Sequence, residues 1–135
     1  MPAGYSGTPL AKKLGVKDAQ RTWRHGMPDS VAAEIAIAGV SPLLLKIPKP
    51  GLEMAHIFTT RRDELSQLLS KLRPVLEPDG TIWVSWPKKA AKIPTEVDED
   101  VVRAEALPLG LVDVKVCTVD ETWSGLKLVI RKAER

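Results

Sequence analysis

The sequence predicts an α/β fold, a three-layer sandwich with a mixed, mostly parallel sheet that ends in an antiparallel hairpin. Segments rich in β-branched and aromatic residues alternate with segments of helical periodicity, an order that favours parallel strands joined by helices. The last two apolar segments alternate in a period of two and are joined by a short polar turn, as in a hairpin. A chain of 135 residues suits one domain.

The first predicted element is a short helix. Thr8 can cap it, Pro9 is suited to its first position, and Gly15 can end it in the left-handed conformation. We therefore expect residues 1–19 to form a loop and a short helix packed on a single domain that spans residues 1–135.

Three further elements are predicted before residue 50. Residues 20–25 are a strand candidate, and Asp29 or Ser30 can cap a helix over residues 31–38. The apolar run 43–45 suggests a buried strand, although its length alone does not distinguish a strand from a helix fragment.

The second half begins with an extended run over residues 53–59. Thr60 to Asp63 has the character of a capping box, and leucines spaced along residues 65–76 mark one face of a helix, whose last turn Pro74 should tighten. Residues 78–80 read as a turn, and residues 81–86 as a central strand.

The last third holds one helix and the hairpin. A second capping box at Thr95 to Asp98 starts a helix that uses Val97, Val101 and Ala104 and stops at Gly110. Valines alternate with other residues over 112–117, leucines alternate over 126–131, and Asp120-Glu121 connects the two strands.

Composition excludes several classes of function. The 20 Lys and Arg nearly balance the 17 Asp and Glu, so a nucleic-acid role is expected to be weak at most. A single Cys forms no internal disulfide and no Cys-based zinc cage. No apolar run approaches the ~20 residues of a membrane span, and the start of the chain lacks the features of a secretory signal. We expect a cytoplasmic protein without membrane contact.

The candidate site lies where parallel strands end. Ligands of open α/β sheets bind outside the carboxyl ends of the strands, and a helix N-terminus adds backbone donors for an anion. The residues expected at this rim are His25, Thr59, Thr60, Arg61, Arg62, Trp86, Lys88 and Lys89. They predict a site for a phosphate, a carboxylate or a nucleotide. The alternative is that the threonines only shape the turn and the cations are solvated.

The sequence contains no recognisable catalytic constellation. No serine elbow, paired carboxylates or spaced histidines accompany His25, and His56 and Cys117 fall in the middle of predicted strands. We therefore expect a binding or regulatory role rather than catalysis, with a small anionic ligand or a protein partner, and neither a metal nor a cofactor.

Four strings carry a family resemblance: residues 4–15 (GYSGTPLAKKLG), 83–89 (WVSWPKK), 111–117 (LVDVKVC) and 123–130 (WSGLKLVI). With them the chain resembles an uncharacterised bacterial family, domain of unknown function 3052. The second half is also similar to the C-terminal half of class I methyltransferases. That resemblance implies a truncated methyltransferase-like fold, and a divergent S-adenosylmethionine-dependent methyltransferase is the alternative function.

Two features of methyltransferase cofactor sites are absent from the sequence. The turn at residues 25–29 has one glycine, Gly26, where the superfamily has a glycine-rich loop. Residues 41–47 contain no acid to hold a ribose. We expect a scaffold that kept the sheet and lost the cofactor site.

Overall fold

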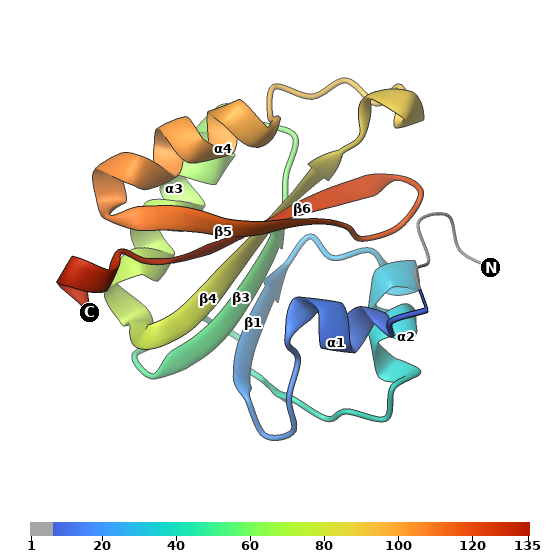
Figure 1. Ribbon diagram of the computed structural model, residues 1–135, viewed down its shortest axis with the longest axis horizontal. Helices are drawn as coiled ribbons and strands as arrows, with labels where there is room; N and C mark the ends of the chain where they lie inside the picture. The colour runs from blue at the N-terminus through green and yellow to red at the C-terminus, as the bar shows by residue number, and fades with distance from the viewer. Residues whose placement is uncertain (1–6) are drawn as a thin grey trace.

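The computed structural model describes residues 7–135, which form one six-stranded sheet with the order β2-β1-β3-β4-β6-β5. Its strands are β1 (Arg21–His25), β2 (Leu43–Leu44), β3 (Leu52–Phe58), β4 (Leu76–Pro87), β5 (Leu111–Thr118) and β6 (Trp123–Ile130). The neighbours from β2 to β4 are parallel, and β6 runs antiparallel to both β4 and β5. The predicted mixed sheet with its closing hairpin is confirmed (Figure 1).

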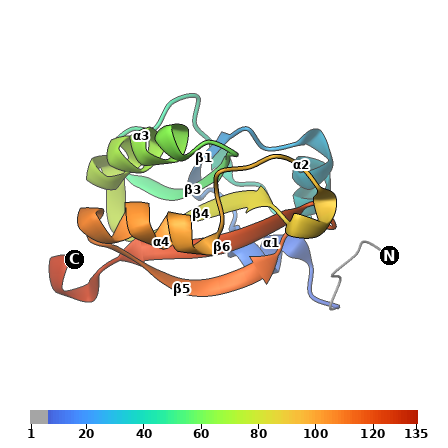
Figure 2. The same ribbon diagram turned by 90° about the horizontal axis from the view of Figure 1, so that it is seen from above.

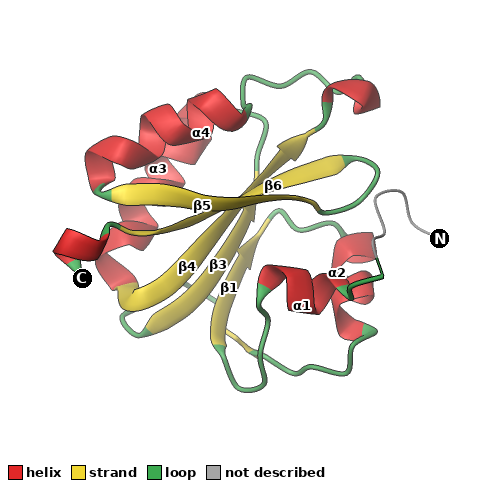
Figure 3. Cartoon of the chain, in the orientation of Figure 1, coloured by secondary structure: helices red, strands yellow, loops and turns green. Residues whose placement is uncertain are grey.

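Two pairs of helices enclose the sheet. Their bounds are α1 (Leu10–Leu14), α2 (Asp29–Ala36), α3 (Arg62–Leu72) and α4 (Glu99–Ala106). Figure 2 shows α3 and α4 side by side, and Figure 3 shows the helices flanking the central strands. No helix among residues 7–135 is long and apolar enough to cross a membrane. Residues 1–6 of the predicted N-terminal loop lie outside the described part of the chain.

Each face of the sheet buries its own apolar cluster. Alternate residues of a strand point to opposite faces. Val84 and Trp86 accordingly join the cluster under α3 and α4, and Trp83 joins the one under α1 and α2. The Trp83 indole is fully buried, and its Nε1 donates to the Leu14 carbonyl at 2.8 Å, which ties the end of α1 to the middle of β4.

The predicted caps of the first two helices are wrong. Pro9 is the N-cap of α1 and no side chain caps it, so Thr8 does not have this role. Pro28 is the N-cap of α2, which places Asp29 inside the first turn, where its carboxylate suits the helix dipole. Proline suits a helix start because its missing N–H needs no partner there. Gly15 ends α1 at φ 80, as predicted.

The later helices also begin differently from the prediction. The N-cap of α3 is Arg61, without a side-chain bond, so Thr60 does not cap it. α4 begins after Asp98, whose Oδ1 accepts from the Val101 N–H at 2.9 Å. Val97 therefore lies outside the helix, and the predicted buried face, which was counted from Val97, is shifted. Val102 is fully buried in place of Val101.

Two local predictions about strands need correction. β2 has only two residues, and its leucines are 54% exposed because it is the outermost strand of the sheet. Residues 78–80 are part of β4, where the pairing with β3 shifts register, rather than a free turn. The predicted strand with alternating valines is confirmed as β5, an outer strand in which Val114 and Val116 are each 55% exposed.

Candidate functional site

The carboxyl ends of β1, β3 and β4 lie together because these strands are parallel neighbours. Two hollows open beside this rim. One, of about 350 Å³, is lined by residues that include Trp86, Lys88, Lys89 and Glu96, and we call it the lysine hollow. The other is lined by Arg61, Arg62, Glu96 and Glu105, among others. Glu96 is common to both.

The arginines of the rim are engaged by acids of the same chain. Arg61 makes two hydrogen bonds to Asp63, at 3.1 and 2.7 Å. Arg62 donates from Nε to Glu105 at 2.8 Å. The hydrogen bond from Arg61 lowers the pKa of Asp63, and the one from Arg62 lowers the pKa of Glu105. Both guanidinium groups therefore have a counter-charge already.

The N-terminus of α3 is engaged in the same way. Glu96 Oε1 accepts from the Arg62 backbone N–H at 3.0 Å, so a carboxylate from a distant loop takes the donor that an external anion would use. Glu96 was not among the site residues predicted from the sequence, where its position indicates a local capping box. Its acidic side chain was visible, but its partner 34 residues away was not.

The two threonines build the turn between β3 and α3. Thr59 is buried, and its Oγ1 accepts from the Arg61 N–H at 3.2 Å. The Thr60 carbonyl accepts from the Glu96 N–H at 2.8 Å, which joins this turn to the segment before α4. Both residues shape the rim, Thr59 through hydrogen bonds of its hydroxyl within the turn and Thr60 through its backbone carbonyl.

His25 lies apart from the lysine hollow. It ends β1 on the face covered by α3, and its Nε2 is 3.7 Å from Glu64 Oε2. The Trp23 ring lies 5.7 Å away on the same face. The structure therefore places His25 against α3 and not among the residues that line either hollow of the rim.

The other three predicted residues meet in the lysine hollow. Trp86 is only 7% exposed, and its indole belongs to the core under α3 and α4, so it lines the hollow without offering an open ring face. The Lys88 N–H donates to the Thr122 carbonyl at 2.8 Å, which fixes the backbone at the end of β4. Lys89 begins a single 3-10 turn, Lys89–Ala91.

Charge is left uncompensated at these lysines. Within residues 7–135 neither Lys88 nor Lys89 forms an ion pair. Two carboxylates, Glu96 and Asp98, line the same hollow without pairing with the lysines, and each accepts a backbone N–H, at the start of α3 and of α4 respectively. The hollow can therefore contribute two ammonium groups to an anion.

His56 is a second polar feature, in the interior of the sheet. It is 1% exposed, its Nε2 lies 2.8 Å from Ser85 Oγ, and its ring stacks on Phe58 at 4.4 Å. Burial, and secondarily the charge of Arg24, lowers its pKa to about 3. A neutral, enclosed imidazole belongs to the core, which agrees with its position in the middle of a strand.

The resemblance to methyltransferases implies a site for S-adenosylmethionine at the ends of β1 and β2. Gly26 has φ 66, and a Cβ there would lie 2.9 Å from the Phe58 carbonyl oxygen. Glycine is thus required by the close approach of this turn to β3. After β2, residues 45–49 contain two lysines and no acid, whereas ribose binding in such folds uses an acid. The residues present do not fit a cofactor held in this way.

No family model matches the chain, and no curated protein sequence matches it. Solved structures do. The mitomycin 7-O-methyltransferase MmcR matches with a TM-score of 0.63 at 13% identity, over 90% of this chain and 53% of that one. The chain thus spans about half the length of that enzyme.

Two smaller structures match over most of both chains. The CcbJ methyltransferase from Streptomyces caelestis has a TM-score of 0.59 at 11% identity, over 92% of this chain and 90% of that one. A SAM-dependent methyltransferase from Aquifex aeolicus has a TM-score of 0.59 at 15% identity, over 90% and 88%. The chain has the fold of class I S-adenosylmethionine-dependent methyltransferases.

Proposed function

We propose that the protein is a non-catalytic binding or regulatory domain that holds a small anionic group in the lysine hollow. The observation that supports this most directly is the pair Lys88 and Lys89, which have no ion-pair partner within residues 7–135 while the neighbouring arginines are compensated. An anion there would be held by charge-assisted hydrogen bonds from two ammonium groups. A protein partner that presents a carboxylate or a phosphate would be recognised by the same chemistry.

Isothermal titration tests this with pyrophosphate, citrate and adenosine monophosphate as probes. We expect saturable binding of at least one probe, weakened tenfold or more in a Lys88→Gln, Lys89→Gln double variant. Lys71→Gln is the matched control, because Lys71 is an exposed lysine on α3. Absence of binding by all three probes, or equal affinity in the double variant and the control, would contradict the small-ligand form of the proposal.

A divergent S-adenosylmethionine-dependent methyltransferase is the second candidate. What favours it is the likeness of fold, which extends over 90% of this chain in the match to MmcR. What weighs against it is the single glycine and the missing acid at the cofactor position. Thermal unfolding with added S-adenosylmethionine separates the two candidates. At one hundred times Kd the cofactor should stabilise the fold by about 2.7 kcal/mol, or roughly 10 °C in Tm. No shift at millimolar cofactor would count against the enzyme.

We also propose that the chain belongs to the family named domain of unknown function 3052, on the strength of the four strings given above. Two of these, residues 83–89 and 123–130, pair with each other in the β4–β6 ladder. Residues 83–89 also include both lysines of the hollow. A profile built from bacterial sequences that carry all four strings should align over the whole chain, and an alignment confined to one string would contradict membership.

A further inference from the structure

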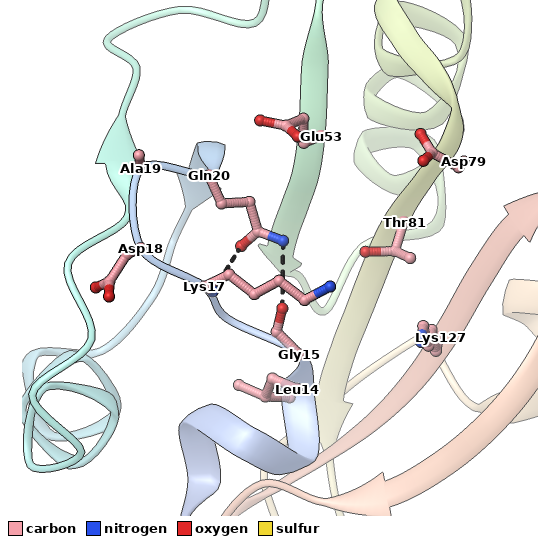
Figure 4. A pocket seen from close by; sticks show the side chains of 10 residues that line it. All are labelled: Leu14, Gly15, Lys17, Asp18, Ala19, Gln20, Glu53, Asp79, Thr81 and Lys127. Carbon is pink, nitrogen blue, oxygen red and sulfur yellow. Dashed lines mark hydrogen bonds between the residues drawn. The ribbon is translucent and has the colours of Figure 1, made fainter.

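A third hollow lies at the opposite end of the parallel strands from the lysine hollow. It has a volume of about 360 Å³ and lies between the loop after α1 and the sheet. We call it the loop pocket. The polar side chains that line it include Lys17, Gln20, Glu53, Asp79, Thr81 and Lys127 (Figure 4). β3 and β4 begin at this end of the sheet, and β6, which runs antiparallel to β4, ends near it. A volume of this size suits a small molecule.

The loop wall of the pocket is held by internal hydrogen bonds. The Gln20 side chain accepts from the Lys17 N–H at 3.3 Å and donates to the Gly15 carbonyl at 3.2 Å, as the dashed lines of Figure 4 show. Asp18 Oδ1 accepts from the Ser41 N–H at 2.8 Å. These bonds maintain the loop shape without a ligand, so the pocket is preformed and binding would require little ordering.

Ala19 gives further support for a preformed wall. Its φ is 59, a left-handed conformation that a residue with a Cβ adopts at some cost, and its N–H donates to the Ser41 carbonyl at 2.8 Å. Such a conformation persists where the surrounding bonds determine it.

The charges of the pocket are of both signs, and four of the charged side chains that line it have no ion-pair partner among the described residues. Glu53 forms an ion pair with Arg21, with 3.7 Å between Oε1 and Nε. Arg21 also forms an ion pair with Glu77, with 3.6 Å between Nη2 and Oε1. Lys17, Asp79 and Lys127, by contrast, have no ion pair within the described residues. Asp18 has none either, but its carboxylate accepts from the Ser41 N–H.

Lys127 and Asp79 lie at different positions along the sheet. Lys127 pairs with Trp83, four residues further along β4 than Asp79. That offset corresponds to roughly 13 Å of strand. Figure 4 shows the Lys17 side chain extended toward Thr81, which lies between Asp79 and Lys127 along the sheet. The two lysine side chains and the Thr81 hydroxyl therefore lie further along β4 than Asp79, which is near the start of that strand.

We propose that the loop pocket binds a small, flexible zwitterion. Its anionic group is held by Lys17, Lys127 and the Thr81 hydroxyl, and its cationic group by Asp79. The separation of the charges favours a molecule with several bonds between its two ends over an α-amino acid. The two lysines alone would bind many anions. Asp79 is the residue that favours a ligand with a positive charge at its other end.

A series of ω-amino acids tests the proposal on the full chain. Amide chemical shifts in ¹H–¹⁵N spectra are followed while glycine, 4-aminobutyrate or 6-aminohexanoate is added, with hexanoate and hexylamine as singly charged controls. We expect saturable shifts at residues 15–20 and at Thr81, and tighter binding of 6-aminohexanoate than of glycine or either control. Equal binding of hexanoate and 6-aminohexanoate, or no saturable shift with any probe, would overturn the proposal.

Substitutions then test the assigned roles. Asp79→Asn and Lys127→Gln should each weaken 6-aminohexanoate binding tenfold or more, and Asp79→Asn should leave the weaker binding of hexanoate unchanged. Glu121→Gln is the control for loss of an exposed acid. Well-dispersed spectra would verify that each variant is folded. Lys88→Gln should have no effect, so the result is independent of the function proposed for the lysine hollow, and an equal effect of all four substitutions would contradict the site.

Discussion

Acidification should destabilise the protein through one buried side chain, His56. The imidazole is 1% exposed, contacts Ser85 Oγ at 2.8 Å, and stacks on Phe58. Its pKa is lowered to about 3, first by burial and then by the charge of Arg24. Protonation would place a positive charge in the interior, near the charge of the half-buried Arg24, so the folded chain resists it.

The magnitude follows from proton linkage. An unfolded chain protonates this histidine near pH 6.5, whereas the folded chain does so only near pH 3. The free energy of unfolding is therefore unaffected by protonation of His56 well above pH 6.5. Below pH 6.5 it decreases by about 1.4 kcal/mol for each pH unit, down to about pH 3. Between pH 7.5 and 5.0 the expected loss is about 2 kcal/mol. For a chain of 135 residues this is about 7 °C in Tm.

Urea unfolding at several pH values between 7.5 and 5.0 measures this loss. His56→Gln should remove most of the pH dependence. His25→Gln should retain it, because it removes the surface imidazole and leaves His56 in place. If His56→Gln does not fold, the ring resonance of His56 in the unchanged protein provides a second measurement, and it should not titrate above pH 5. A native titration midpoint near 6.5, or identical pH dependence in all three proteins, would refute the reasoning.

Five substitutions, two of them controls, test three structural contacts by chemical unfolding. Trp83→Phe should cost about 2–4 kcal/mol, because it leaves a cavity and an unpaired carbonyl at the end of α1, and a loss below about 0.5 kcal/mol would show that this bond is unimportant. Asp98→Ala should cost about 1 kcal/mol by removing the cap of α4, while Thr8→Ala, at a position without a cap bond, should cost almost nothing. Gly26→Ala should destabilise more than Gly39→Ala, because both have positive φ but only the first would press a Cβ against β3. Equal losses for the two glycines would exclude the close contact.

The order of the strands and helices could be predicted from the sequence because it depends on local periodicity. The alternation at 126–130 places Leu126, Leu128 and Ile130 on one face, and all three are buried in β6. Gly110 ends the helical segment before β5 at φ 76, as its position suggested.

The details of the helix starts and of the outer strands could not be predicted in this way. Three leucines in a row predicted a buried strand, but burial depends on what covers a strand, and β2 lies at the edge of the sheet. Thr60 had the pattern of a cap, yet Arg61 occupies the N-cap of α3. A pattern of residue types does not show which backbone group another part of the chain will reach first.

By itself, the sequence determined the α/β class, the closing hairpin and the strand ends where charged side chains gather. Only the tertiary structure decided which of those charges are free. The Arg62 backbone N–H donates to Glu96, 34 residues away, and its side chain donates to Glu105, 43 residues away. Both contacts exist because α4 and the segment before it pack beside α3. Lys88 and Lys89, which line a hollow together with Glu96, have no ion-pair partner within the described chain. Coulombic compensation depends on distance in space, and sequence spacing does not record that distance.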